Sequence, residues 1–481
     1  MVSFFIALGV LIIGYIFYGI FVEKVFGMNN SIKTPAYVQD DGVDYVPMPT
    51  WKVFMIQFLN IAGLGPIFGA ILGIAYGPAA FLWIALGTIF GGGVHDYLSG
   101  MISLRKNGVS LPDVIGDELG KSVKQASRVF SVLLLILVGA VFVINPAALL
   151  AQLSGGFFSL NVWICIIFGY YILATLLPID KLIGNLYPVF GFALLFMAVG
   201  IFVALVPHLN VIPEFTDGLY NRHTNPESNP IFPMMFISIA CGAVSGFHAT
   251  QSPLMARCIK QEKYGRVVFY GAMVSEGIVA LIWAAATIVF FKGSFTDLNA
   301  YETINNNAPS ILVNNISINW LGAFGGVLAI LGVVAAPITT GDTALRSARL
   351  IVADCLKYDQ TKILKRLIIS VPIFILVFFI MQMKYDVLWR YFAWSNQTLA
   401  TFTLWAVTIY LAKLGKKYII SLIPAIFMTM VTTQYILFAK EGFRIDYNIA
   451  LVISSVVTIV CMGLFAKFVI GLRTSSESKP V

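Results

Sequence analysis

Two apolar stretches of this chain are long enough to cross a membrane as helices, yet each is interrupted halfway. The first runs from about 51 to 71 and contains Asn60–Ile67 (NIAGLGPI), and the second runs from 231 to 249 and contains Cys241–His248 (CGAVSGFH). Glycine and proline at these positions favour breaks in a helix. Backbone without helical hydrogen bonds is costly in lipid unless protein covers it or it lines a cavity. Two interruptions in corresponding segments therefore predict a pair of discontinuous helices around a binding site.

Apolar residues are the majority in the 481-residue chain, and they occur in long blocks. Of the sequence, 59% is hydrophobic and 11% is charged, whereas a soluble chain carries about 25% charged residues. Blocks of about 20 apolar residues match the thickness of a bilayer. The formal charge of +8 is no sign of nucleic-acid binding, because the basic residues lie between the blocks. The five scattered cysteines suggest no disulfide framework, and no phosphate-binding loop supports an ATP-driven pump.

Thirteen membrane spans are predicted from these blocks. They cover 2–22, 51–73, 78–98, 129–153, 159–177, 187–207, 231–253, 267–291, 318–338, 367–383, 388–412, 418–438 and 448–471. The loops after the odd-numbered spans hold 23 Lys and Arg residues, and those after the even-numbered spans hold 5. Because positively charged loops stay in the cytoplasm, this asymmetry places the N-terminus outside and the C-terminus in the cytoplasm.

The two interrupted segments are the second and seventh spans, which are five apart and therefore run in opposite directions. They begin two inverted five-helix repeats, at 51–207 and 231–412, an arrangement of the leucine-transporter type. Residues 1–50 form the first span and a cytoplasmic loop, and 413–481 form two accessory spans and a short cytoplasmic tail. We therefore predict an all-α polytopic membrane protein with a 5+5 inverted repeat, discontinuous second and seventh helices, and accessory helices.

The unwound ends of such helices suit charged ligands. A half-helix N-terminus offers N–H groups and partial positive charge to a carboxylate, and a half-helix C-terminus offers carbonyls to a cation. We expect a substrate carboxylate against Gly63–Ile67 and Ser245–His248, positioned by Asn60 and Gln251. Two adjacent amides of the eleventh span either hydrogen-bond neighbouring helices or line the path. The predicted substrate-binding residues are Asn60, Gly63, Gly65, Pro66, Ser245, Gly246, His248, Gln251, Asn396 and Gln397.

A carboxylate, Glu276, lies about ten residues into the eighth span. A charge at that depth is costly unless it is paired, protonated or facing water. Glu276 serves either as a structural hydrogen bond between helices or as a proton or cation site. His95 and Asp96 end the third span, and His248 follows the second interruption. Histidine titrates near physiological pH, and His95 and Asp96 join Glu276 in the predicted coupling group, although each histidine alone is as well explained by packing. A metal site of His95, Asp96 and His248 is conceivable, but no ligand spacing supports it.

Two hydroxyls and a carboxylate end the ninth span, at Thr339, Thr340 and Asp342. They offer oxygens to a coupling cation, or they cap the helix that follows. That helix, at 345–355, has apolar residues at helical spacing with two arginines opposite, which predicts a helix on the cytoplasmic membrane surface. The sequence predicts no cofactor, and it leaves the coupling ion open between H⁺ and Na⁺.

Short motifs of one known type are spread over most of the predicted membrane core. They are Thr34–Ala36, Asp44–Pro47, Asn60–Gly69, Pro78–Ala79, Val94–Asp96, Ser103–Arg105, Ser245–His248, Tyr270–Met273 with Glu276, Thr339–Thr343 and Asn396–Ala400. As an ordered set, they resemble the carbon starvation CstA family of peptide and pyruvate transporters. The resemblance implies an importer of small nutrients with a leucine-transporter-like core, driven by a proton or sodium gradient. It also implies the cytoplasmic (inner) membrane of starved bacteria.

We therefore expect a secondary active symporter and not an enzyme, which imports peptides or pyruvate-like carboxylates by alternating access. Its expected partners are a small-molecule substrate and membrane lipids, and no nucleic acid. The rival interpretations are a channel with the broken helices as a fixed filter, a membrane-embedded metal-dependent enzyme, and a nutrient sensor. Long members of the family extend beyond the shared core, whereas this chain ends after a short polar tail, 474–479. We thus expect no soluble regulatory domain, and the substrate stays open between peptides and pyruvate.

Overall fold

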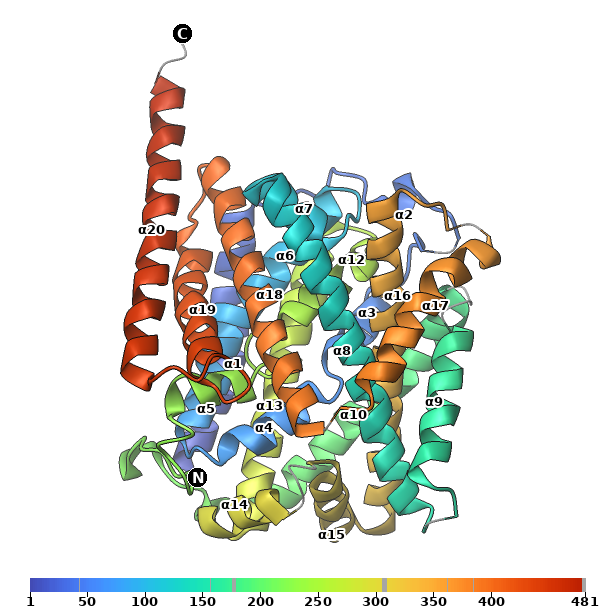
Figure 1. Cartoon of the computed structure of the whole chain (residues 1–481), viewed down its shortest axis with the longest axis vertical. Coiled ribbons are helices and arrows are strands. Elements are labelled where there is room, and N and C mark those ends of the chain that lie inside the picture. The colour runs from blue at the N-terminus through green and yellow to red at the C-terminus, as the bar shows by residue number, and fades with distance from the viewer. Residues whose placement is uncertain are drawn as a thin grey trace.

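Over the residues that the computed structural model describes, the chain is a bundle of helices. The described residues are 1–42, 44–155, 157–174, 179–304, 309–360, 362–383 and 385–477. In chain order the helices are α1 (Val2–Phe26), α2 (Pro35–Val38), α3 (Thr50–Ile61), α4 (Gly65–Ile74), α5 (Ala79–Leu86), α6 (Gly93–Arg105), α7 (Leu111–Leu119), α8 (Lys121–Leu153), α9 (Leu160–Ala174), α10 (Ile179–Leu205), α11 (Phe236–Ser238), α12 (Gly246–Ala256), α13 (Ala272–Phe290), α14 (Phe295–Ile304), α15 (Pro309–Ala329), α16 (Ala336–Leu356), α17 (Ile363–Ile380), α18 (Tyr385–Lys413), α19 (Ile419–Phe438) and α20 (Tyr447–Glu477). Figure 1 shows α2 and α7 at one end of the bundle and α14 and α15 at the other.

The long helices have the length and composition of membrane spans. Nine of the described helices meet this standard, and a tenth does so if the bent pair α3–α4 is one span. Other predicted spans fall on shorter helices such as α9, so the number of thirteen stays a prediction. The end of the predicted fifth span, 175–177, and residues 478–479 of the predicted tail lie outside the described residues.

The first predicted interruption is a short break between two helices. α3 ends at Ile61, α4 begins at Gly65, and the two helices are bent by 45° relative to each other. Pro66 lies in the first turn of α4, where its missing N–H costs no helical hydrogen bond. A Cβ atom at Gly65 would lie 2.2 Å from the Cβ atom of Cys241 in the second interruption. Glycine therefore allows the two interrupted segments to touch.

The second interruption is longer and lies against the first. Residues 239–245 separate α11 from α12, and Ser245 is extended. α4 packs against α11, and α3 packs against α12. Figure 1 places α3 and α12 toward the end of the bundle that holds α2 and α7, and α4 toward the opposite end. The two interrupted segments therefore run in opposite directions through the bundle.

The predicted surface helix at 345–355 is wrong. This segment continues α16, and the apolar helical run from Gly325 to Leu356 has no break before it. Arg346 and Arg349 are only 1% and 3% exposed, and Arg346 Nη2 donates a hydrogen bond to the Ala174 carbonyl at 2.8 Å. Helical periodicity marks a polar face, but it cannot tell whether water or protein covers that face. Here protein covers it.

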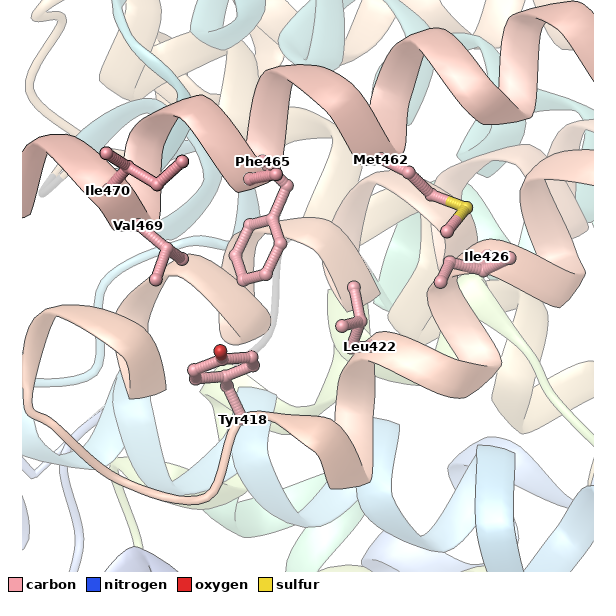
Figure 2. Close-up of a pocket in the computed structure, with 8 residues that line it drawn as sticks. Tyr418, Leu422, Ile426, Met462, Phe465, Val469 and Ile470 are labelled. Carbon is pink, nitrogen blue, oxygen red and sulfur yellow. The ribbon is translucent and has the colours of Figure 1, made fainter.

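An apolar groove lies between the last two helices (Figure 2). It has a volume of about 320 Å³. Its lining residues are Tyr418, Leu422, Ile426, Met462, Phe465, Ala466, Val469 and Ile470. Only the Tyr418 hydroxyl is polar, so the groove offers no group that would hold a small anion. The polar residues of interest lie elsewhere, around the two interruptions.

Candidate functional site

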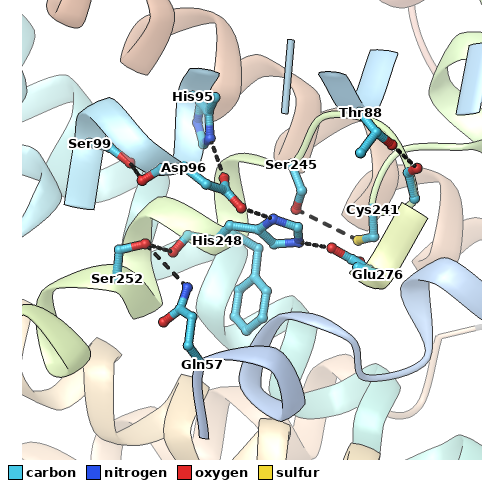
Figure 3. Close-up of polar contacts among 12 residues, drawn as sticks. Gln57, Thr88, His95, Asp96, Ser99, Cys241, Ser245, His248, Ser252 and Glu276 are labelled. Carbon is cyan, nitrogen blue, oxygen red and sulfur yellow. Dashed lines mark hydrogen bonds and ion pairs between the residues drawn. The ribbon is translucent and has the colours of Figure 1, made fainter. Parts of the chain in front are cut away.

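A chain of four buried ionisable side chains connects three helices near the second interruption (Figure 3). Glu276 comes from α13, His248 from the first turn of α12, and Asp96 and His95 from the start of α6. His248 Nδ1 lies 2.8 Å from Asp96 Oδ2, and His95 Nδ1 lies 2.7 Å from Asp96 Oδ1. His248 Nε2 lies 3.3 Å from Glu276 Oε2. All four side chains are 0% exposed.

The two contacts of His248 differ in kind. The contact with Asp96 is a hydrogen bond, whereas the contact with Glu276 is within ion-pair distance but lacks hydrogen-bond alignment. Both carboxylate oxygens of Glu276 have no hydrogen-bond partner. Buried charges are tolerated only when they are paired and hydrogen-bonded. Of the two carboxylates in this four-residue row, Glu276 is therefore the one without hydrogen bonds. His248 lies between it and Asp96.

These residues do not form a metal site. Among the described residues, no group of three His, Cys, Asp or Glu side chains is placed to hold a metal ion. The reason is visible at His248, whose two ring nitrogens face two different carboxylates on opposite sides. The side chains thus lie in a row and do not converge on a point. This arrangement gives no support to the membrane-embedded metal enzyme.

The N-terminus of α12 is capped by a side chain from α18. Asn396 Oδ1 accepts hydrogen bonds from Phe247 N at 2.7 Å and from Ser245 Oγ at 3.1 Å. A Cβ atom at Gly246 would lie 2.4 Å from the backbone nitrogen of Ala400, so glycine allows α18 to pack directly on the interruption. The N–H group expected to meet a substrate carboxylate is therefore bonded to Asn396 in this structure. The neighbouring Gln397 turns elsewhere, and its Nε2 donates to Phe236 O at 3.4 Å.

The three polar residues predicted at the end of the ninth span contact different neighbours. Thr340 Oγ1 donates to Leu59 O, at the last turn of α3, over 3.1 Å. The Thr339 hydroxyl donates a hydrogen bond to Ala336 O of its own helix at 2.7 Å. Asp342 Oδ2 instead accepts a hydrogen bond from the Tyr187 hydroxyl at 3.0 Å. Of these three residues, only Thr340 therefore contacts the first interruption. The sequence did not predict Tyr187 as the partner of Asp342.

Of the other predicted residues, Asn60 and Gln251 lie in the same buried polar region. Asn60 Oδ1 accepts from Thr343 Oγ1 at 3.4 Å, and Gln251 Nε2 donates to Ser347 Oγ at 3.4 Å. Gln57 belongs there too, although sequence reasoning missed it. It precedes Asn60 by three residues on α3, and this helical spacing was the available signal. Gly63 and Pro66 serve the packing of the first interruption.

Proteins with related sequences include named membrane transporters. An uncharacterized membrane protein of Haemophilus influenzae is 44% identical over 340 residues, which covers 61% of this chain and 92% of that protein. The peptide transporter CstA of Campylobacter jejuni is 28% identical, over 91% of this chain and 80% of its own length. The pyruvate/proton symporter BtsT of Escherichia coli is 27% identical, over 64% of this chain and 53% of its own length. Transport, and not enzymatic catalysis, is the activity that the two named relatives share.

Solved structures with a similar backbone are transporters as well. A manganese transporter of Eremococcus coleocola superposes with a TM-score of 0.60 at 12% identity, over 90% of this chain and 99% of that one. MhsT in complex with L-phenylalanine gives 0.51 at 15% identity, over 84% and 97%. At such identities the likeness shows the fold alone, which is that of the leucine-transporter type.

The predicted family is confirmed by a family model. The model described as carbon starvation protein CstA matches residues 1–173, 151–320 and 306–435, which together span most of the chain. The multi-pass helical architecture agrees with this assignment. The chain therefore belongs to the CstA family of carbon starvation proteins.

Proposed function

We propose that this chain is a proton-coupled importer of small nutrients, either peptides or pyruvate-like carboxylates, in the cytoplasmic membrane of a bacterium. The observation that carries the proposal is the position of His248, between Asp96 and Glu276 and in the first turn of a half-helix. Two relatives, a peptide transporter and a pyruvate/proton symporter, support the class of substrate.

The proposed architecture has two inverted repeats, 51–207 and 231–412, and it places the N-terminus outside the cell. The interrupted segments then form discontinuous membrane helices, one at the start of each repeat. Their opposite directions and mutual contacts support this arrangement. In it, the halves α3 and α12 line the cytoplasmic side of the site, and α4 and α11 line the outer side. Alternating access results when these helices rock against the remaining helices.

Proton and substrate are coupled through α12. The helix N-terminus carries partial positive charge, which favours an anion. A proton on the chain of Glu276, His248 and Asp96 removes negative charge next to that terminus. A substrate carboxylate therefore binds better when the proton is present, and by reciprocity the proton binds better when the substrate is present. Each solute entering with its proton is then driven by the proton gradient.

The substrate carboxylate takes the place of Asn396 Oδ1 at the second interruption. Phe247 N and Ser245 Oγ donate to Asn396 now, and they are the groups that a carboxylate would use. Substrate binding then requires α18 to withdraw from Gly246. A sodium-coupled variant of the mechanism would instead use Thr340 Oγ1 and the Leu59 carbonyl, two oxygens at the end of α3, because half-helix C-termini suit cations.

Uptake into proteoliposomes tests the proposal. Purified protein is reconstituted, and accumulation of labelled dialanine and labelled pyruvate is measured with a proton gradient, a sodium gradient or neither. We expect the proton gradient alone to drive accumulation of at least one solute above the external concentration. Accumulation that follows the sodium gradient and ignores the proton gradient would refute proton coupling. Rapid downhill flux that never exceeds the external concentration would favour a channel instead.

A further inference from the structure

A neutral polar cluster lies between α3, α12 and α16, separate from the ionisable chain. We call it the amide cluster, and its members are Gln57, Asn60, Thr250, Gln251, Ser252, Thr343 and Ser347. Each of these side chains is at most 5% exposed, and Gln57, Asn60 and Gln251 are 0% exposed. The cluster has no charged member. Its oxygen and nitrogen atoms therefore define which hydrogen bonds a ligand could make there.

The orientation of the Gln57 amide follows from its partner. Ser252 Oγ donates its proton to His248 O at 3.0 Å, so toward Gln57 it can only accept. The Gln57 group that faces Ser252 Oγ, at 3.4 Å, is therefore the Nε2 amide. Figure 3 shows the carbonyl oxygen of Gln57 pointing away from Ser252. That Oε1 atom is buried and has no hydrogen-bond partner.

The same reasoning orients Gln251. Thr250 Oγ1 donates to Phe247 O at 2.6 Å, so it accepts from Gln251 Nε2 at 2.9 Å. Ser347 Oγ is a second neighbour of this nitrogen at 3.4 Å. Gln251 Oε1 is left buried without a partner. The cluster thus contains two glutamine carbonyl oxygens that can only accept hydrogen bonds.

Buried acceptors without partners are rare, because leaving them unpaired is costly. We propose that the amide cluster is a substrate subsite whose two glutamine oxygens accept N–H groups of the transported solute. A keto acid such as pyruvate has acceptors and no N–H donor, so it cannot satisfy them. A peptide can, because it carries an ammonium group and an amide N–H. The unpaired Asn60 Nδ2 offers a donor to the carbonyl oxygen of the same peptide.

This inference rests on the proposed function and narrows its substrate class to short peptides and related amides. Because α3 and α12 lie on the cytoplasmic side in the proposed orientation, the subsite lies between the interruptions and the cytoplasm. The carboxylate of the peptide is then held at the second interruption, and its N–H groups point toward Gln57 and Gln251.

The test compares Gln57→Met and Gln251→Met with a matched control, Gln434→Met. Methionine keeps the length of glutamine and lacks its acceptor. Gln434 is 0% exposed in α19, but both of its amide atoms are paired, with Tyr447 O and Ser454 Oγ. Proton-driven uptake of dialanine and of pyruvate is measured for each variant in proteoliposomes. We expect the KM for dialanine to rise about 3- to 10-fold in each test variant, because each variant loses one hydrogen bond to the peptide. The KM for pyruvate should rise less, and the control variant should change neither value.

The outcomes separate the two proposals. If dialanine is accumulated and its KM is unchanged in both test variants, the subsite is refuted and the transport function stands. The subsite is also refuted, and the transport function stands, if the unmodified protein accumulates only pyruvate. The same conclusion follows if the variants raise the KM for both solutes equally. If the proton gradient drives accumulation of neither solute, the proposed function itself fails. Thermal unfolding of each purified variant verifies that it is folded.

Discussion

Both interruptions are breaks in a helix, but the side chains around them differ in their chemistry. The first spans three residues between α3 and α4, and its polar neighbours are the uncharged Thr340 and Thr343 of α16. The second spans seven residues between α11 and α12 and adjoins His248, with its two carboxylate partners. The first therefore suits packing and neutral or cationic ligands, and the second suits the exchange of protons. Two interruptions with similar backbones therefore need not carry the same chemistry.

Replacing Glu276 by Gln should have the largest effect, because it changes the ionisable residues at the second interruption. The variant removes the carboxylate that faces His248 while keeping its shape. We expect proton-driven accumulation to fall about 5- to 150-fold, the range of a typical coupling free energy. Exchange of internal for external substrate, measured in proteoliposomes without a gradient, should persist. A Glu276→Gln variant that accumulates substrate like the unmodified protein would remove Glu276 from the coupling mechanism.

Replacing His248 by Gln should act on stability as well as on transport. It leaves two buried carboxylates without the imidazole between them, and breaking a buried ion pair costs about 3–5 kcal/mol. We expect a clearly lower unfolding temperature in detergent and the loss of proton-driven uptake. His208→Gln, at an exposed position of the short 3-10 helix Val206–Val211, is the control and should change neither. Equal stability of the two variants would show that His248 is not a charge partner in the folded state.

Asn396→Asp probes the cap of the second interruption. A carboxylate at this position would compete with the substrate carboxylate for Phe247 N and Ser245 Oγ. We expect the KM for substrate to rise about tenfold, which corresponds to about 1.4 kcal/mol. Asn396→Ala removes the cap and should instead lower the stability of the empty protein by about 1 kcal/mol. An unchanged KM in Asn396→Asp would place the substrate carboxylate elsewhere.

Both interruptions were predictable from the sequence, because glycine and proline are poor helix formers and stand out inside an apolar run. Glu276 was also predictable, since a carboxylate at that depth is equally conspicuous. The pairing of His248 with Asp96 was not, because the two residues are 152 positions apart and only the packing of α12 on α6 brings them together. The cap by Asn396 and the partner of Asp342 depend on the same kind of long-range packing. The buried arginines of α16 were misjudged, because the amphipathic pattern is the same whether water or protein covers the polar face.

Thr340→Val probes the neutral first interruption and should have a smaller effect. The variant loses the hydrogen bond from Oγ1 to Leu59 O, for which we expect a loss of about 1 kcal/mol in unfolding free energy. Proton-driven uptake should be retained, because no ionisable group is touched. Loss of all gradient-driven uptake in Thr340→Val would show that the first interruption takes part in coupling. The proposed difference between the two interruptions would then be wrong.

The smallest expected effect lies far from both interruptions, at Glu214 in the segment that follows α10. Hydrogen bonds from the N-terminal amine and from Ser3 lower the pKa of Glu214 from 4.5 to about 2. A lowered pKa means that these contacts stabilise the fold above pH 4.5 and lose this effect as the pH falls toward 2. Glu214→Gln should therefore lower the unfolding temperature slightly at about pH 6, and by less at about pH 3. A difference that grows on acidification would contradict the assignment.

The most direct test of the central claim measures protons and substrate together. Proteoliposomes with a pH-sensitive dye inside are exposed to an outside excess of substrate, with no ion gradient and with choline in place of sodium. If the row from Glu276 to His95 carries the coupling proton, the interior acidifies as substrate enters, and Glu276→Gln abolishes the signal. Substrate entry without acidification, or only when sodium is added, would contradict the account.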